Sequence, residues 1–312
     1  MTVALSELGE FSTLAPGVDF APWEGLTYPA YAKSVADGEF PWLAAAVRGV
    51  NGEPLGLALA RLDAPERKAD LLSVYVAPPH RWRGLGVALL CRLREDIARR
   101  TGLERLSVNY GSRISGLEAL EKTIVRAGYG TPFTRIFFGQ SRIANIPRWA
   151  KGAGGSAAAD WRVISWAKAR SEGIDPIERG SCAGGPAHLS VRFRESEIDW
   201  STSQMLFSGG EAKGWFVTHR FAEKPDTLYY TKFWVEPGFA ARHRAAAVLL
   251  LRAAMNAHYE MFLKDGAPSC AEFDVPLEYP DWLRSLNKHL VPCLDKTWTL
   301  RGLEVPLAFA RA

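Results

Sequence analysis

Apolar residues follow two different periods on either side of a proline break in the N-terminal half of the chain. Residues 70–76 are mostly apolar or β-branched, which is typical of a buried strand. Pro78 and Pro79 end this run, because proline lacks the N–H that a strand ladder needs. After a short basic stretch the apolar positions recur every four residues, at Leu85, Leu89, Leu93 and Ile97. The pattern therefore predicts a strand, a turn and a helix that ends near residue 100.

Further elements surround this strand and helix. Two apolar runs flank Asn51-Gly52, a turn signal that predicts an antiparallel hairpin. The aromatic-rich first 40 residues predict one or two short helices. This succession of helices and strands predicts an α/β (α+β) fold in which a mixed sheet is covered by helices. The expected ranges are a helix at 28–35, hairpin strands at 41–50 and 55–62, strands at 104–110 and 133–139, and a helix at 115–127.

The second half of the chain repeats the pattern of the first. A turn at 209–214, a strand at 227–237 and a long apolar helix at 244–264 follow the same order as the hairpin turn, strand and helix above. At an offset of 159 residues, Val235 and Pro237 align with Val76 and Pro78. Chance similarity of two apolar strands is the alternative interpretation.

A segment of small residues separates the two halves. Residues 151–159 are a lysine followed by glycine, alanine and serine, a composition typical of a flexible linker. We therefore predict two domains, 1–150 and 160–312, each with a mixed central sheet flanked by helices.

Composition excludes several classes of function. The 312 residues, 47% of them hydrophobic, can supply two cores. The charge is nearly balanced, with 38 basic against 34 acidic residues and no long basic block, so we expect no nucleic-acid partner. The sequence shows no membrane-length apolar run and no signal-peptide pattern, so we expect a cytoplasmic protein with no membrane partner. The four cysteines and six histidines lack metal-ligand spacing, and we expect no metal.

A basic segment with two glycines, Arg81-Trp82-Arg83-Gly84-Leu85-Gly86, joins the first strand to its helix. It lies at the helix N-terminus, where unpaired N–H groups and a positive dipole end favour an anion. Glycine lets the backbone approach a bulky anion, and the arginines add charge. On the glycines alone, a tight turn with solvated arginines explains the segment equally well.

The complete string V-x-P-x-x-R-x-x-G-x-G resembles the acyl-CoA-binding motif of the GNAT superfamily of N-acyltransferases. Val76, Pro78, Arg81, Gly84 and Gly86 occupy its positions, whereas the dinucleotide motif G-x-G-x-x-G fails at position 89. The resemblance implies acetyl-CoA or another acyl-CoA as co-substrate, with its diphosphate on the loop. The donor-binding residues that it implies are Val74, Tyr75, Val76, Arg81, Trp82, Arg83, Gly84, Leu85, Gly86, Val87 and Asn109.

The resemblance also assigns roles within that set. In the family, the strand before the loop offers backbone N–H groups to the thioester oxygen, and the sheet opens beside it to admit the pantetheine arm. Val74, Tyr75 and Val76 form this strand, and the role falls to their main chain. Asn109, near the end of the next strand, is placed to bond the pantetheine amides.

The second copy has lost these features. His243 and Ala245 stand where the first copy has Gly84 and Gly86, and Ala240 replaces the first loop arginine. A side chain at the first glycine position crowds the backbone surface that a diphosphate needs. We therefore expect acyl-CoA in the N-terminal domain and a degenerate GNAT-like C-terminal domain that serves as scaffold and part of the substrate wall.

Two residues are candidates for proton transfer, which acylation of an amine requires. Asp70 stands where several GNAT enzymes have a glutamate that acts as general base, although an ordinary strand-end charge is the alternative. The tyrosine that many members use to protonate the leaving thiolate is replaced by Ile124. Tyr110 is our first choice for that donor, with a plain core tyrosine as the alternative.

The resemblance implies direct transfer of an acyl group, most simply acetyl, from acyl-CoA to a primary amine of a small molecule. One alternative is acylation of a protein lysine or N-terminal amine. Another is a CoA-binding protein without transferase activity, or one with a different acyl-CoA reaction. The sequence does not specify the acceptor, the acyl chain or the oligomeric state.

Overall fold

The chain forms two compact units, and one strand of each comes from the other half of the sequence. The computed structural model describes residues 9–145, 160–243, 245–277, 288 and 290–307. Unit 1 comprises residues 1–135 and 299–312, and unit 2 comprises residues 136–298. Each unit is described by itself.

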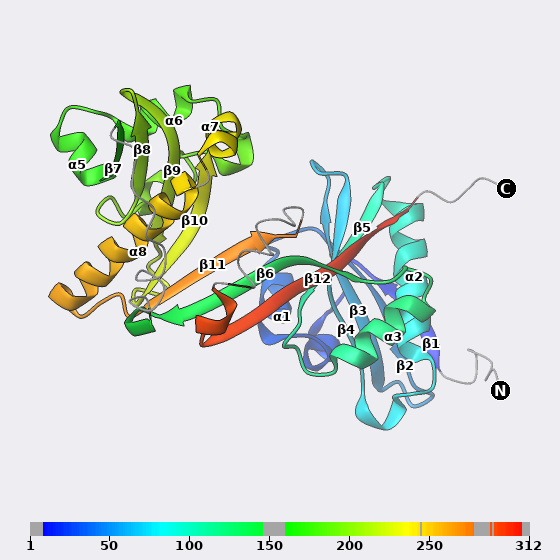
Figure 1. The fold of residues 1–312 in the computed structure, drawn as a ribbon. Coiled ribbons are helices and arrows are strands. Elements are labelled where there is room, and N and C mark those ends of the chain that lie inside the picture. Colours follow the sequence, from blue (N-terminus) through cyan, green and yellow to red (C-terminus); the bar gives the residue numbers. More distant parts are fainter. Residues whose placement is uncertain (1–8, 146–159, 244, 278–287, 289, 308–312) are drawn as a thin grey trace. The chain divides into compact units, whose positions relative to one another are not determined.

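Unit 1 is a mixed sheet with helices on both faces (Figure 1). Neighbouring strands of this sheet are antiparallel, except that β4 and β5 are parallel. Helix α1 covers one face, and α2 and α3 cover the other. The strands, in sheet order, are β1 (Glu10–Leu14), β2 (Trp42–Arg48), β3 (Pro54–Asp63), β4 (Lys68–Val76), β5 (Arg105–Gly111) and β12 (Lys296–Pro306). The helices are η2 (Ala21–Leu26), α1 (Pro29–Ala36), η3 (Pro78–His80), α2 (Leu85–Arg100) and α3 (Leu117–Arg126).

The core of unit 1 confirms the helical period seen in the sequence. The apolar face of α2 packs on β2, β3 and β4, and its predicted positions Leu85, Leu89, Leu93 and Ile97 are all buried. On the opposite face, Trp23 and the α1 residues Ala32 and Val35 pack on the other side of β2 and β3. Burial of apolar area on both faces holds β2, β3 and β4 in place beside α2.

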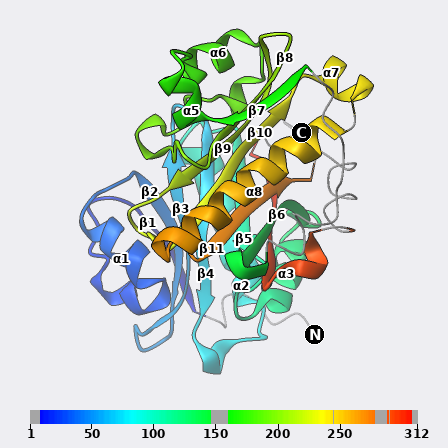
Figure 2. The ribbon, with the colours of Figure 1, turned by 60° about the vertical axis from the view of Figure 1, so that its left-hand side comes forward.

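Unit 2 has the same plan. Helix α8 lies across one face of its sheet (Figure 2), and α5 and α6 pack on the other. The strands, in sheet order, are β7 (Trp161–Ser165), β8 (Gln204–Ser208), β9 (Glu211–Arg220), β10 (Thr227–Val235), β11 (Cys270–Pro276) and β6 (Phe133–Arg142). The helices are η4 (Ile143–Asn145), α5 (Trp166–Ser171), α6 (Pro176–Cys182), η5 (Ala187–Leu189), η6 (Glu195–Glu197), α7 (Pro237–Arg242), α8 (Ala245–Asp265) and η7 (Val291–Cys293).

The repeat predicted from the sequence is confirmed strand by strand. At the offset of 159, the bounds of β4 and β10 coincide. Both strands carry a bulge at the same place, Leu72 in β4 and Thr231 in β10. Before the bulge, each strand pairs in parallel over four residues with the strand that follows it in the sequence. Chance similarity does not produce matching bulges and registers, so the two halves share one fold.

Two features differ from the expectation. The strand expected at 133–139 is β6, but from Ile136 onward it belongs to unit 2, where it pairs with β11. Residues 299–306 of β12 instead complete unit 1 by pairing with β5. Alternation along a strand shows which side faces a core but not which sheet the strand joins, so this exchange was not predictable from the pattern of residues. The predicted linker, 151–159, lies outside the described residues.

Candidate functional site

The sheet of unit 1 opens between its two parallel strands. The ladder between β4 and β5 ends at Leu71 and Val108, although β4 continues to Val76 and β5 to Gly111. The bulge at Leu72 lies at the point where the ladder ends. A bulge increases the local twist of a strand, which gives a physical reason for the separation.

The main chain of β4 faces this opening at alternate residues. The N–H of Ala77 donates to the carbonyl of Leu55 on β3, at 2.8 Å. Because successive residues of a strand direct their N–H groups to opposite sides, Tyr75 also faces β3, whereas Val74 and Val76 face the opening. Of the three residues expected to contact the thioester through their main chain, two have the required direction.

The loop after β4 has two residues in the left-handed region. Trp82 has φ +67° and Gly84, the residue that caps α2, has φ +90°. A Cβ on Gly84 would meet nothing within 4 Å, so this glycine is needed for its conformation and leaves open space above the helix N-terminus. The carbonyl of Gly84 accepts the first bond of the helix, from Ala88 at 3.0 Å. The N–H groups of the first turn therefore point into that space.

The second loop glycine has a different role from the one expected. A Cβ on Gly86 would lie 3.1 Å from the Cγ2 of Thr123 on α3. Gly86 thus allows α2 and α3 to pack closely, and the approach to an anion depends on Gly84. The sequence motif does not distinguish these two reasons for a glycine.

The two loop arginines also differ. Arg81 folds back, donating from Nε to the carbonyl of Val76 at 2.9 Å and placing its guanidinium 5.2 Å from the ring centre of Tyr75. Arg83 is exposed and makes no hydrogen bond or ion pair with any described residue. Arg83 is therefore the cation available to a ligand, while Arg81 stiffens the turn.

Asp70 lies on the α1 face of the sheet and is engaged in an ion pair. Its Oδ2 accepts from Nη2 of Arg61, directly opposite on β3, at 2.7 Å. It pairs in the ladder with Ser107 of β5. Asp70 is therefore paired with a residue across the ladder and not with Arg67 or Lys68, the basic residues near it in the sequence.

Tyr110 lies on the opposite face, in the core beneath α2 and α3. Its hydroxyl donates to Oε1 of Glu121 on α3 at 3.0 Å, and Nε of Arg301 on β12 donates to the same oxygen at 2.6 Å. Burial, together with the hydrogen bond to this carboxylate, raises the pKa of Tyr110 to about 12. The structure thus places Asp70 and Tyr110 on different faces, and neither Glu121 nor Arg301 was found from the sequence because both act over long separations.

The remaining sequence candidates have defined places. Asn109 is exposed; its amide donates to Ser107 at 2.8 Å, and its carbonyl accepts from Arg135 at 2.9 Å. Ile124 is fully buried in the core, as expected for a position that has lost a polar role. Leu85 is buried under the loop, and Val87 packs against the same core.

In unit 2 the corresponding connection is closed by a helix. Residues 237–242 form α7, and Phe239 is buried against Trp161, with ring centres 5.3 Å apart. His243, at the position of Gly84, has φ −132° and contacts both rings, edge-to-face against Trp161 and tilted against Phe239. An aromatic cluster therefore takes the place of the open glycine cap, which agrees with the expected loss of a diphosphate site.

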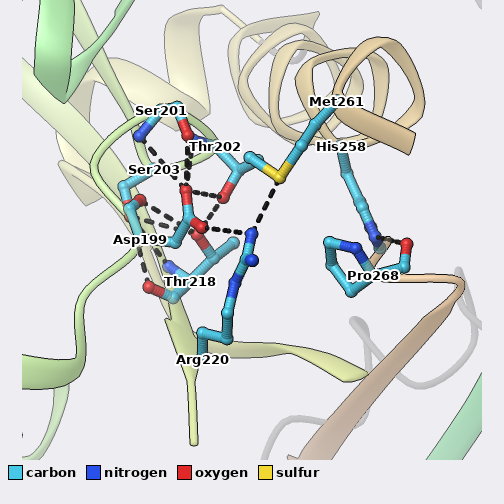
Figure 3. Close-up of polar contacts among 9 residues, drawn as sticks. All are labelled: Asp199, Ser201, Thr202, Ser203, Thr218, Arg220, His258, Met261 and Pro268. Atoms are coloured by element: carbon cyan, nitrogen blue, oxygen red, sulfur yellow. Dashed lines mark hydrogen bonds and ion pairs between the residues drawn. The ribbon is translucent and has the colours of Figure 1, made fainter. Parts of the chain in front are cut away.

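Unit 2 instead contains a buried polar network that the sequence did not reveal (Figure 3). Asp199 accepts from the backbone and side chains of Ser201 and Thr202 and from Arg220. Burial would raise the pKa of Asp199, but these donors hold it below its usual value. Thr202 and Thr218 are fully buried and bonded to each other at 2.6 Å. The network is internally satisfied and ties the segment before β8 to β9, so it is structural.

The described residues offer no alternative centre. They contain no group of three histidine, cysteine or acidic side chains arranged to hold a metal. Within the same ranges, no helix is long and apolar enough to cross a membrane.

Comparison with known proteins agrees with the geometry. Residues 10–113 match the family model described as the acetyltransferase (GNAT) family. A tandem GNAT protein from the clavulanic acid biosynthesis pathway, solved without acetyl-CoA, is similar at 16% identity and a TM-score of 0.52, over 96% of this chain and 99% of that one. A GCN5-related N-acetyltransferase from Sphaerobacter thermophilus is similar at 17% identity and a TM-score of 0.52, over 95% of this chain and 96% of that one. No curated protein sequence matches significantly.

The family match covers about a third of the chain, and the structural matches cover nearly all of it. Residues 10–113 resemble the acetyltransferase (GNAT) family, and the chain as a whole has a fold similar to that of the tandem GNAT protein. Proteins of the matched family use acetyl-CoA or another acyl-CoA as co-substrate.

Proposed function

We propose that this protein is an N-acyltransferase that transfers an acyl group, most simply acetyl, from acyl-CoA to a primary amine of a small molecule. The observation that carries the proposal is the open helix cap at Gly84, in the unit whose sequence matches the acetyltransferase family. Unit 2 acts as scaffold, because its corresponding cap is filled by aromatic side chains.

The loop fits a diphosphate. The N–H groups of the first turn of α2 are directed outward, no side chain covers Gly84, and Arg83 adds an unpaired positive charge. Hydrogen bonds from backbone amides at a helix N-terminus suit phosphate oxygens and do not depend on the rest of the ligand. These groups would hold the CoA end of the donor in place.

The acyl transfer itself would take place at the opening between β4 and β5. The thioester of the donor would lie along β4, where the N–H groups of Val74 and Val76 face the gap. Backbone donors that are already directed at a carbonyl oxygen stabilise the negative charge that forms when an amine attacks. Acyl transfer then breaks the carbon–sulfur bond, forms the amide bond and releases the thiol of CoA.

Proton transfer is assigned to Asp70 and Tyr110. Asp70 would accept the proton of the attacking amine, directly or through water, from the α1 face. Tyr110 would protonate the departing thiolate, but its hydroxyl is bonded to Glu121 and its pKa is raised to about 12, so it is a weak acid at neutral pH. Of the two assignments, the structure favours that of Asp70.

The loop proposal is tested by calorimetry of acetyl-CoA binding. Arg83→Glu combined with Gly84→Glu adds two negative charges and a side chain at the cap, and we expect affinity to fall at least 100-fold. The matched control is Arg242→Glu with His243→Glu, at the same positions of unit 2, which should leave affinity unchanged. Unchanged affinity in the first variant, or loss in the second alone, would place the donor elsewhere.

The acceptor is tested separately, by measuring release of the CoA thiol with acetyl-CoA as donor. Small primary amines should support release, and lysine-containing peptides of matched concentration should not. Preferential turnover of the peptides would replace the small-molecule acceptor by a protein. Absence of turnover with every amine, despite donor binding, would leave a CoA-binding protein without transferase activity.

A further inference from the structure

A tryptophan beside the helix cap is presented to solvent in an unfavourable backbone conformation. Trp82 is 86% exposed, more than any other aromatic residue among those described. Its φ of +67° lies in the left-handed region, which is unfavourable for a bulky residue. Glycine or asparagine would adopt this conformation with less strain, so folding alone does not explain a tryptophan here.

The indole ring is also unpartnered. Trp82 makes no ring contact, cation–π contact or hydrogen bond with any described residue. The neighbouring Arg81, which could have covered it, lies instead over the ring of Tyr75. A large flat apolar surface is therefore free on both faces, two residues from the glycine that opens the cap.

The degenerate copy lacks this ring. At the offset of 159, the residue that corresponds to Trp82 is Ala241, within α7. The copy whose cap is closed by His243 thus has no exposed indole either. Within this chain, the aromatic surface accompanies the open cap.

We propose that the indole of Trp82 stacks on the adenine of the acyl-CoA donor, and so selects a donor that carries the nucleotide over one that ends at phosphopantetheine. This inference rests on the proposed function. In CoA the adenosine is joined directly to the diphosphate, so a ligand held by the first turn of α2 places its base beside the loop. Adenine is the flat aromatic part of the donor, and stacking of a base on an aromatic side chain contributes about 1–3 kcal/mol.

The selection has a chemical consequence. Acyl groups are also carried on phosphopantetheine, whose thioester and pantetheine arm are the same as those of CoA but which has no adenine. Both donors would reach the opening between β4 and β5, and only the nucleotide-bearing donor would gain the stacking contact at Trp82. The acyl-transfer chemistry itself would not change.

The experiment compares two donors with three proteins. Acetyl-CoA and S-acetyl-4′-phosphopantetheine are titrated calorimetrically into wild type, Trp82→Gly and Trp82→Phe. We expect Trp82→Gly to weaken acetyl-CoA binding about 10-fold or more and to leave phosphopantetheine binding unchanged. Trp82→Phe, which keeps a ring, should lose much less. The thermal midpoint of Trp82→Gly should not fall, because glycine relieves the strained φ.

The outcomes separate this inference from the proposed function. If wild type binds acetyl-CoA and Trp82→Gly binds it equally well, the stacking contact is wrong and the function stands. Equal weakening of both donors by Trp82→Gly, or a lowered thermal midpoint, would make Trp82 a structural residue and also overturn the inference. If wild type binds neither donor, the function itself fails.

Discussion

The two strand-to-helix connections of this chain differ over a few residues on an otherwise shared frame. In unit 1 the connection is exposed and ends in a left-handed glycine cap; in unit 2 it is a short helix whose Phe239 and His243 fill the corresponding space. The strands before them have matching bounds, bulges and parallel registers. Retention of the opening between the parallel strands therefore does not require retention of an anion site. The cap can be lost while the frame remains.

The buried polar side chains of the two units also differ, and here unit 2 has the additional groups. On β9 of unit 2, Thr218 of the Asp199 network and His219 are fully buried, whereas the corresponding residues on β3 of unit 1 are the aliphatic Leu59 and Ala60. Buried polar groups must be bonded to be tolerated, and bonded networks fix one arrangement of the chain. The unit that lost the cap has gained internal polar order.

The largest expected effect concerns the last strand of each sheet. A Cβ on Gly302 of β12 would collide with the backbone carbonyl of Val108, so Gly302→Ala should destabilise unit 1 by about 3 kcal/mol or more and remove acetyl-CoA binding. The matched variant Gly139→Ala in β6 would meet the ring edge of Phe273 at 2.5 Å, and a ring can shift more easily than backbone. We expect a loss of about 1 kcal/mol there, with binding retained.

Chemical denaturation with and without acetyl-CoA measures both variants. Similar losses of stability in the two variants would mean that β12 and β6 tolerate a side chain at these glycines equally well. Retained donor binding in Gly302→Ala would show that β12 is not needed to hold the site.

Asp70 provides the second comparison, because its counterpart at the offset of 159 is Tyr229, which has no carboxylate. If Asp70 accepts the amine proton, Asp70→Asn should lower kcat/KM by roughly 100-fold, as is typical for loss of a general base. The pH profile of kcat/KM should also lose the limb that reports ionisation of the general base. Arg61→Gln, which removes the ion-pair partner but keeps the carboxylate, is the control and should have a much smaller effect. An unaltered profile in Asp70→Asn removes Asp70 from the mechanism.

The third prediction concerns acid stability. His258 bonds to the Tyr230 hydroxyl and the Pro268 carbonyl, and burial lowers its pKa to about 4. The bond to the Pro268 carbonyl and the charges of Asp199 and Asp226 oppose this shift, whereas the charge of Arg220 adds to it. The unfolded chain, with a histidine pKa near 6.5, then binds more protons than the folded chain between these values. Stability is therefore complete above that range and falls as pH decreases, by about 2 kcal/mol from pH 7 to about pH 5.

Denaturation of wild type and His258→Gln across this pH range measures the effect. The variant should be less stable at neutral pH but should show a shallower dependence on pH. His80 of unit 1 is partly exposed, and His80→Gln is the control, which should leave the slope unchanged. An equal slope in all three proteins would mean that His258 does not control the acid response.

Much of the fold was predictable because local signals agree with it. The hairpin and the period-four helix α2 depend on residues near one another in the sequence, and both are confirmed. The repeat at an offset of 159 compares two such local patterns, and it is confirmed as well. The strand β1 was not predicted, because its alternation is short and lies among aromatic residues. The exchange of β6 and β12 was not predictable, because strand pairing over long separations is not encoded in either strand alone.

The candidate site was predictable in its loop but not in its side-chain network. The motif includes Gly84, and a glycine at this position agrees with its left-handed conformation. The packing role of Gly86 depends on Thr123, which the motif does not include. The pairing of Tyr110 with Glu121 and Arg301 joins three elements, one of them at the far end of the chain. Such contacts appear only when the tertiary structure is known.

The placement of β12 in unit 1 has a consequence for biosynthesis. A ribosome releases the N-terminal half of the chain long before residues 299–306 are made, so the sheet that bears the cap lacks this strand until those residues have been synthesised. A prematurely terminated product would leave β5 with an unpaired edge, which is a hazard for aggregation. Donor binding would thus begin only after residues 299–306 have been made and have paired with β5.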